Sequence, residues 1–285
     1  MKKRLFFLLI PLVLMLVVST SVMNVKAVQF QGKDTDTRGN WWEKIGDEWF
    51  QHYGRDGYIL CGFNTELYTN DDVWAESYDR KHLPSYITGY TVKGTGGAGP
   101  LPPGKAGVYT VPPCPTSDES ALIDPDILND PNVLSMRINS HCFTTPYNDP
   151  NTLLTVELQF SGEACNKYFH LSLYFLDADQ NRKLKVTVSD EEPCGAPQSW
   201  SVDLEPSETK TGVYVVFTVY GPTKLEIRLF NGYNCNPCIS GIFIDSIAVP
   251  PHVIPEVPLG TLSALLACFM PLMLLKKIKG KYASE

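Results

Sequence analysis

Alternation of apolar and polar residues at every second position is the strongest constraint on how this chain folds. It runs through four segments of the second half, residues 169–175, 184–188, 213–219 and 225–229. A period of two places one side of a strand in a core and the other toward solvent. Glycine, proline and asparagine turns separate the segments, and no amphipathic helix lies between them. We therefore expect an all-β fold, an antiparallel jelly-roll-like β-sandwich.

The first half carries fewer strand signals. We predict strands at residues 58–63, 86–92, 133–138 and 153–160. Residues 94–131 are dense in glycine and proline, which indicates a long surface loop or an insertion. The whole of residues 28–250 is expected to form one β-sandwich domain.

Hydrophobic segments at both ends frame this domain. Residues 1–27 have the basic start, apolar run and small-residue cleavage site of a secretory signal peptide. After a linker at 251–256, residues 257–275 carry no charge, and a membrane-spanning helix needs about 20 such residues. Lysines in the tail 276–285 place that end in the cytoplasm. The sequence predicts a single-pass membrane protein whose domain lies outside, at the cell surface.

The charge of this domain limits its partners, and its cysteines allow disulfides. The chain has 31 acidic against 24 basic residues, and eight of the basic ones lie in the two terminal segments, which leaves 16 in the domain. The domain is therefore acidic, which argues against nucleic acid as a partner. Export favours disulfides, and seven cysteines allow at most three pairs in many arrangements. The candidates are Cys61, Cys114, Cys142, Cys165, Cys194, Cys235 and Cys238.

Five short motifs occur in order along the domain. They are Gly39-Asn40-Trp41, Tyr53-Gly54-Arg55-Asp56-Gly57-Tyr58, Leu83-Pro84-Ser85-Tyr86, the stretch 173–179 with Arg182, and Ser240-Gly241-Ile242-Phe243-Ile244-Asp245. Together they resemble an uncharacterised β-sandwich module of bacterial surface and carbohydrate-active proteins, similar in outline to galactose-binding-like jelly rolls. The resemblance implies a fold and a binding role, with carbohydrate as the leading ligand class.

The C-terminal tail resembles a second known pattern. Pro255-Glu256, the apolar run and the lysines are similar to the sorting tails of archaeal surface proteins handled by archaeosortase-type transpeptidases. That resemblance implies cleavage near the Pro-Glu pair. A plain membrane span is the alternative.

Aromatic rings outside the alternating segments are the candidates for stacking on sugars. The predicted ligand-binding residues are Trp74, Tyr78, Asp72, Trp49 and Tyr233. Trp74 leads because it follows a polar loop, whereas burial in a core is the alternative for each ring. Trp41 and Trp42 are adjacent, so in an extended segment they face opposite ways and at least one should be buried.

Calcium is a candidate second ligand of the same domain. The resemblance to galactose-binding-like modules implies a site in which Asp245, on the last strand, meets a carboxylate near the start, Asp34 or Asp36, and calcium prefers such oxygen ligands. No G-x-S-x-G or H-E-x-x-H motif occurs, and no carboxylate pair stands out as that of a glycosidase. We expect a non-catalytic module that binds glycans. The alternative is a structural or adhesive coat protein that contacts neighbouring surface proteins.

Overall fold

The computed structural model describes twelve stretches of the chain, all within one compact unit, Val25–Ala248. They are residues 28–45, 48–63, 79–95, 108–116, 118–125, 137–144, 153–165, 167–177, 182–190, 198–222, 224–231 and 237–247. The predicted signal peptide, linker, membrane span and basic tail lie outside them. Within those twelve stretches no helix has the length and apolar character that crossing a membrane requires.

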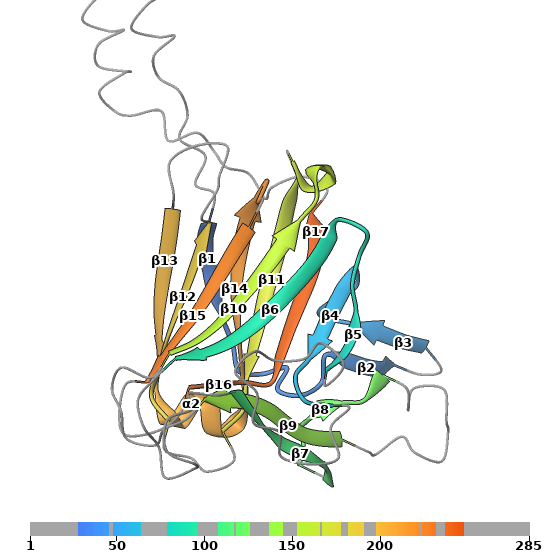
Figure 1. Cartoon of the computed structure of the whole chain (residues 1–285). Helices are drawn as coiled ribbons and strands as arrows, with labels where there is room; N and C mark the ends of the chain where they lie inside the picture. The colour runs from blue at the N-terminus through green and yellow to red at the C-terminus, as the bar shows by residue number, and fades with distance from the viewer. Residues whose placement is uncertain are drawn as a thin grey trace, which may run out of the picture. The chain divides into compact units, whose positions relative to one another are not determined.

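Two antiparallel sheets form the body of the domain, as the sequence predicts (Figure 1). The six-stranded sheet runs in the order β1 (Val28–Asp34), β14 (Val213–Tyr220), β11 (Tyr168–Phe175), β17 (Gly241–Ile247), β4 (Gly57–Leu60) and β5 (Arg80–His82). The five-stranded sheet runs in the order β13 (Gln198–Leu204), β12 (Leu184–Asp190), β15 (Lys224–Asn231), β10 (Leu153–Phe160) and β6 (Ile87–Thr95).

Smaller elements lie at the borders of this sandwich. A third sheet joins β16 (Cys238–Ile239), β9 (Arg137–Thr144), β7 (Val108–Thr116) and β8 (Leu122–Ile123). A separate hairpin pairs β2 (Trp42–Ile45) with β3 (Glu48–Gln51), and it lies beside β4 and β5 in Figure 1. The described helical pieces are short, η3 (Gly162–Ala164) and α2 (Pro206–Thr211).

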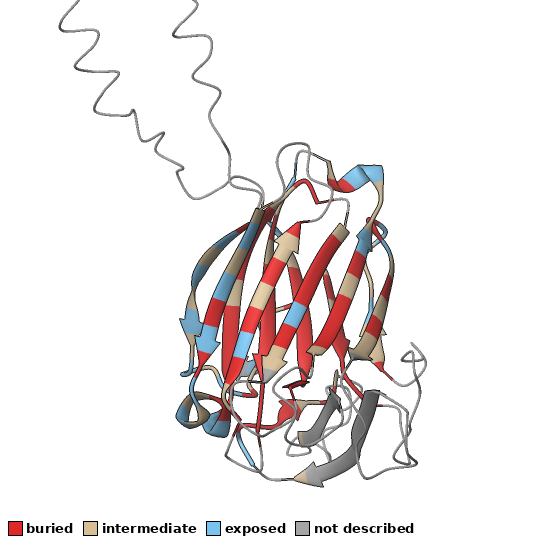
Figure 2. Ribbon diagram, turned by 60° about the vertical axis from the view of Figure 1, so that its left-hand side comes forward, coloured by how far each residue is buried: buried red, intermediate tan, exposed pale blue. Residues whose placement is uncertain are grey.

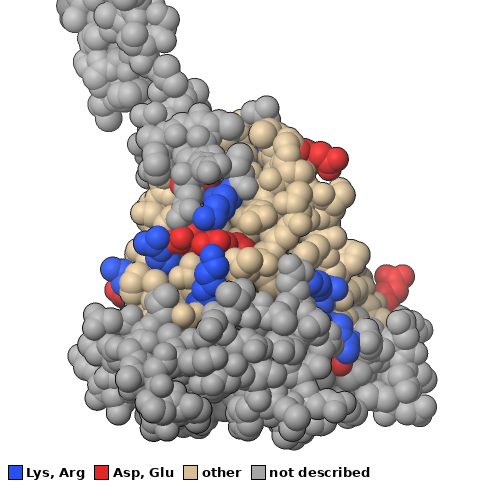
Figure 3. Space-filling view, in the orientation of Figure 1, with Lys and Arg blue, Asp and Glu red and all other residues tan. Residues whose placement is uncertain are grey.

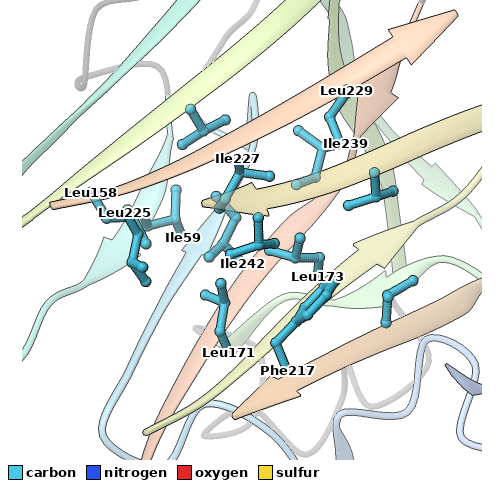
Figure 4. Packing of buried hydrophobic residues seen from close by; sticks show 14 of the residues in the cluster. Ile59, Leu158, Leu171, Leu173, Phe217, Leu225, Ile227, Leu229, Ile239 and Ile242 are labelled. Atoms are coloured by element: carbon cyan, nitrogen blue, oxygen red, sulfur yellow. The ribbon is translucent and has the colours of Figure 1, made fainter. Parts of the chain in front are cut away.

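The main core fills the space between the two large sheets. Buried residues run along the strands of both sheets in Figure 2, and Figure 4 shows side chains of β10 and β15 pointing toward those of β4, β11, β14 and β17. The labelled side chains include Leu158, Leu225, Ile227 and Leu229 on one side and Ile59, Leu171, Leu173, Phe217 and Ile242 on the other. Burial of these alternating residues is what the period of two predicts, and each one stabilises the fold by about 1.5–3 kcal/mol.

A second hydrophobic cluster covers part of the outer face of the six-stranded sheet. Tyr174, Tyr214 and Phe243 come from three neighbouring strands of that sheet and are fully buried. They pack with Trp41 and Leu122, which belong to segments outside the sheet. The sheet is therefore buried on both faces here. This explains why β11 and β14 carry large aromatic residues at positions where a one-sided strand would be polar.

The predicted strands agree with the structure where the alternation is clear. The prediction at 153–160 matches β10, and the four segments of the second half lie within β11, β12, β14 and β15. The prediction at 133–138 overlaps only the start of β9. The stretch 94–131, expected to be a loop or insertion, contains β7 and β8. Prolines inside β7 concealed that strand, and a register shift against β9 lies beside them.

The disulfide prediction is tested only in part by the described residues. Cys165 follows η3, is half-buried and has a free thiol. With an odd number of cysteines in the domain, at least one must stay free or pair with another chain, and Cys165 fits that place. Cys61 and Cys238 are buried in the main core. Cys114 and Cys142 belong to β7 and β9, whereas Cys194 and Cys235 lie outside the described residues. The pairing stays a prediction.

Candidate functional site

A cavity lined by aromatic rings lies where the β2–β3 hairpin meets β4 and β5. Its volume is about 420 Å³. Its lining residues are Trp42, Trp49, Gln51, Gly54, Arg55, Tyr58, His82 and Pro125. Binding sites for small molecules have volumes of about 300–1,000 Å³ and combine apolar walls with a few polar groups. The cavity fits that description.

The hairpin register explains which rings reach the cavity. Trp42 pairs with Gln51 across the hairpin, and Trp49 lies two residues before Gln51. Residues opposite each other, or two apart, share one face of a strand pair, so these three side chains line the cavity together. The other face of the hairpin carries Ile45 and Phe50, which are 56% and 44% exposed. The hairpin thus has a cavity face and a solvent face.

Trp41 anchors the hairpin to the second cluster. Its ring is fully buried, and its Nε1 donates a hydrogen bond to the carbonyl oxygen of Ile123 at 2.9 Å. Its own carbonyl oxygen accepts from the amide of His52 at 2.8 Å. Trp42, the next residue, turns its half-buried ring to the cavity. The expectation that at least one of the two tryptophans is buried is confirmed, but their rings do not face opposite ways. They meet edge to face with centroids 5.9 Å apart, and Trp42 packs against the second cluster that holds Trp41.

Two aspartates hold the loop 53–57 against the end of β17. Asp245 accepts hydrogen bonds from the backbone amides of Gly54, at 2.9 Å, and Arg55, at 2.5 Å. In return, Asp56 of the loop accepts from the backbone amide of Ser246 at 2.6 Å. This exchange in both directions, which we call the aspartate clasp, fixes the loop backbone at the floor of the cavity.

Tyr53, at the start of the same loop, is fixed by its ring and its hydroxyl. The ring stacks on Tyr214 with centroids 4.1 Å apart, and the hydroxyl donates to Asp34 at 2.6 Å. Next to it, Gly54 adopts a φ of +71°, which L-residues rarely adopt. A Cβ there would also lie 2.9 Å from Cδ1 of Phe243. The sequence Tyr-Gly-Arg-Asp-Gly-Tyr therefore needs its first glycine for this close approach.

Burial and hydrogen bonding set the protonation of these groups. Burial raises the pKa of Asp245, although the amides of the clasp partly oppose that rise. Burial acts in the same direction on Asp34 and Asp56, but the hydrogen bonds they accept outweigh it and their pKa values fall below the usual range. Burial, together with neighbouring carboxylates, raises the pKa of Tyr53 and of Tyr86, whose hydroxyl donates to Asp56. Both tyrosines therefore remain protonated donors at neutral pH.

The charges at the cavity differ from those of the chain as a whole. Arg55 and His82 line the cavity, and both side chains are exposed. Among the described residues that line it there is no aspartate or glutamate, whereas the chain has a net charge of −7. On the described surface visible in Figure 3, basic side chains lie close to acidic ones and no broad basic field appears.

Of the predicted ligand-binding residues, the structure describes Trp49 alone, and it lines the cavity. Trp74, Tyr78, Asp72 and Tyr233 lie outside the described residues. The sequence also contained signals for residues that were not selected. Trp42 was visible as the neighbour of a tryptophan expected to be buried, and Arg55 and Tyr58 belong to the Tyr53–Tyr58 motif. Nothing in the sequence distinguished His82 or Gln51.

The predicted calcium ligands have other contacts in the structure. Both oxygens of Asp245 accept backbone amides of the clasp. Asp36 is exposed, and its backbone amide donates to Asp34 at 2.9 Å. Within the described stretches no three His, Cys, Asp or Glu side chains gather as metal ligands would. A calcium site at Asp245 and Asp36 stays a prediction that these contacts do not support.

Comparison with known proteins does not assign the chain to a family. No protein-family model and no curated protein matches it. Among solved structures it is similar to TmCBM61 in complex with β-1,4-galactotriose, with 11% identity, a TM-score of 0.28, and coverage of 56% of this chain and 86% of that one. It is also similar to the enzymatically active domain of tailspike protein 4 of bacteriophage CBA120, with 11% identity, a TM-score of 0.33, and coverage of 56% and 20%.

A third similar structure is an exo-β-1,3-galactanase from Phanerochaete chrysosporium with galactose. Its identity is 18% and its TM-score 0.24, over 36% of this chain and 23% of that one. This chain therefore matches about a fifth of the length of the tailspike domain and of the galactanase. Likenesses at this level carry no argument about function, which must be argued from the cavity itself.

Proposed function

We propose that this chain is a non-catalytic module that binds carbohydrate at the cavity between the β2–β3 hairpin and β4. The observation that carries the proposal is the grouping of the Trp42, Trp49 and Tyr58 rings around one cavity. Aromatic rings offer flat apolar faces with a polar edge, which suit the C–H faces of a pyranose. Gln51 and Arg55 add hydrogen-bonding groups at the same place.

The rigidity of the cavity floor supports binding by a preformed site. The aspartate clasp fixes the loop backbone, and Tyr53 is held by both stacking and a hydrogen bond. A site that is ordered before the ligand arrives loses less entropy on binding. The signal peptide and the span at 257–275 would place this module at the cell surface on a single anchor.

A glycan array with the full chain, wild type and Trp49→Ala, tests the proposal. Phe50→Ala is the matched control, because it removes an adjacent ring from the solvent face of the same hairpin. We expect selective retention of a glycan class by the wild type and by Phe50→Ala, with loss in Trp49→Ala. Removing one stacked ring should weaken binding by about 1–3 kcal/mol, or about 5- to 150-fold. Equal glycan retention by both variants would show that the cavity is not the binding site.

The solvent face of the hairpin favours a second candidate function, adhesion to another protein. Ile45 and Phe50 are the large hydrophobic side chains that stand exposed on the described surface. Apolar side chains grouped on an exposed element are typical of contact sites between proteins. If adhesion is the function, Phe50→Asp abolishes attachment between cells that display the chain and Trp49→Ala leaves it intact. A cell-aggregation assay with these two variants separates the two functions.

A further inference from the structure

The charge and the hydrogen-bonding groups of the cavity limit the class of ligand that it can bind. Resting on the proposed function, we infer that it takes an acidic saccharide, one that carries a carboxylate or sulfate group which Arg55 binds. Three observations carry this inference: the charges of the lining, the unused guanidinium of Arg55, and the excess of donors over acceptors.

The lining is basic within an acidic chain. Among the described residues that line the cavity, Arg55 carries a charge and no carboxylate joins it. The chain has 31 acidic and 24 basic residues. A guanidinium at the cavity attracts an anionic ligand to that place, whereas the acidic surface elsewhere repels it.

The guanidinium of Arg55 is not engaged by the described part of the protein. Other arginines there have partners within 3.3 Å, namely Arg38 with Glu119, Arg80 with Asp124, Arg137 with the Ala121 carbonyl and Arg182 with Asp177. Arg228 pairs with Glu226 in the same way. Arg55 makes no side-chain hydrogen bond or ion pair within the twelve described stretches, although its backbone amide is held by Asp245.

The two carboxylates near Arg55 do not accept hydrogen bonds from its guanidinium. Asp245 and Asp56 both feel the charge of Arg55. Both oxygens of Asp245 are occupied by backbone amides, and Oδ2 of Asp56 accepts from Ser246 and from Tyr86. The backbone of Arg55 is thus fixed at the cavity, while its five side-chain N–H donors have no acceptor among the described residues. That fork matches a carboxylate or sulfate with two parallel hydrogen bonds.

Donors exceed acceptors along the lining. Nε2 of Gln51 donates to the carbonyl oxygens of Tyr53 and Gly54, at 3.0 and 2.6 Å, which leaves its Oε1 as an acceptor. Arg55 donates only, and His82 can donate from its exposed ring. Neutral sugar hydroxyls need acceptors as well as donors, whereas an acid group only accepts. The lining is therefore better matched to a saccharide that carries an anionic group than to a neutral one.

The test compares the full 285-residue chain, purified in detergent, with its Arg55→Gln variant. Both are applied to an array of neutral, uronate, sialylated and sulfated glycans and titrated with α-1,4-trigalacturonic acid and neutral α-1,4-galactotriose. Arg38→Gln is the control, since it removes an exposed arginine that is not part of the lining. Thermal unfolding shows that each variant is folded, and Trp49→Ala reports on the cavity independently of charge.

We expect the wild type to retain acidic glycans and Arg55→Gln to bind them about 10- to 100-fold more weakly, as loss of a charged hydrogen-bonding partner predicts. High salt should weaken the binding of acidic glycans by the wild type toward the level of Arg55→Gln, and Arg38→Gln should bind them as the wild type does. Equal binding of neutral and acidic glycans, unchanged in Arg55→Gln but lost in Trp49→Ala, would overturn this inference and leave the proposed function standing. A folded wild type that retains no glycan would overturn both.

Discussion

The single glycine at the cavity floor gives the sharpest test of how the site is built. Gly54→Ala introduces a Cβ at a φ of +71°, a backbone conformation that costs an L-residue about 1–2 kcal/mol. That Cβ would also lie 2.9 Å from Phe243 and 3.0 Å from the Gly57 carbonyl oxygen. The Phe243 ring is fully buried in the second cluster, so it has little room to move, and crowding of this kind costs about 1–3 kcal/mol.

The two costs are partly offset, because alanine lowers the entropy of the unfolded chain by about 0.4–1 kcal/mol relative to glycine. The net expectation for Gly54→Ala is a loss of about 1–4.5 kcal/mol, which lowers the Tm of a domain of this size by about 2–18 °C. Gly32→Ala is the matched control, since a Cβ at Gly32 meets no atom within 4 Å and its φ is not positive. Calorimetry that compares the Tm of the two variants tests this expectation. A Gly54→Ala protein that unfolds at the temperature of Gly32→Ala would show that the loop is not held as described.

Two further predictions concern buried hydroxyls and acid stability. The Tyr214 hydroxyl is buried with no hydrogen-bond partner among the described residues, whereas the Tyr174 hydroxyl donates to the Ser120 carbonyl oxygen. Tyr214→Phe should therefore unfold at or above the wild-type Tm, and Tyr174→Phe should lose about 1 kcal/mol; the reverse order in calorimetry would refute the assignment. Hydrogen bonds hold the pKa of Asp34 below its ordinary value of 3.8, so its carboxylate stabilises the fold above that value and the contribution disappears as pH falls through the lower, native pKa. Asp34→Asn should show a flatter decline of Tm with pH in this acid range, and parallel curves for variant and wild type would contradict it.

The strands of the sandwich were predictable because most of them bury one face. Leu153–Phe160 was predicted to its exact bounds, since its alternation is regular and turns flank it. Strands with other surroundings gave weaker signals. β1 lies at the edge of its sheet and contains a register shift beside Gly32, and β7 contains prolines. Alternation of apolar and polar residues at every second position cannot reveal strands whose regularity is broken by a register shift or by prolines.

The candidate site was less predictable than the fold. Trp49 was selected from its residue type and its position outside the alternating segments. Its neighbours in the cavity come from β2, β3, the loop before β4, β4 itself, β5 and Pro125. The β2–β3 hairpin brings Trp42 and Gln51 beside Trp49, whereas the other neighbours come from parts of the chain farther away in sequence. His82 reaches the cavity because its strand pairs with β4 opposite Tyr58, a register that no local pattern records.

The aspartate clasp has a mechanical consequence. The loop at the floor of the cavity is tied by Asp245 and Asp56 to the last residues of β17, and β17 is the strand after which the chain continues toward its C-terminal segment. Tension between a ligand held in the cavity and a tether beyond Ile247 would enter β17 directly. That strand has antiparallel neighbours on both sides, β11 and β4, so a pull along its axis loads two ladders of hydrogen bonds in shear. Bonds loaded in shear must break together rather than one after another, which gives this fold a short and strong path for force.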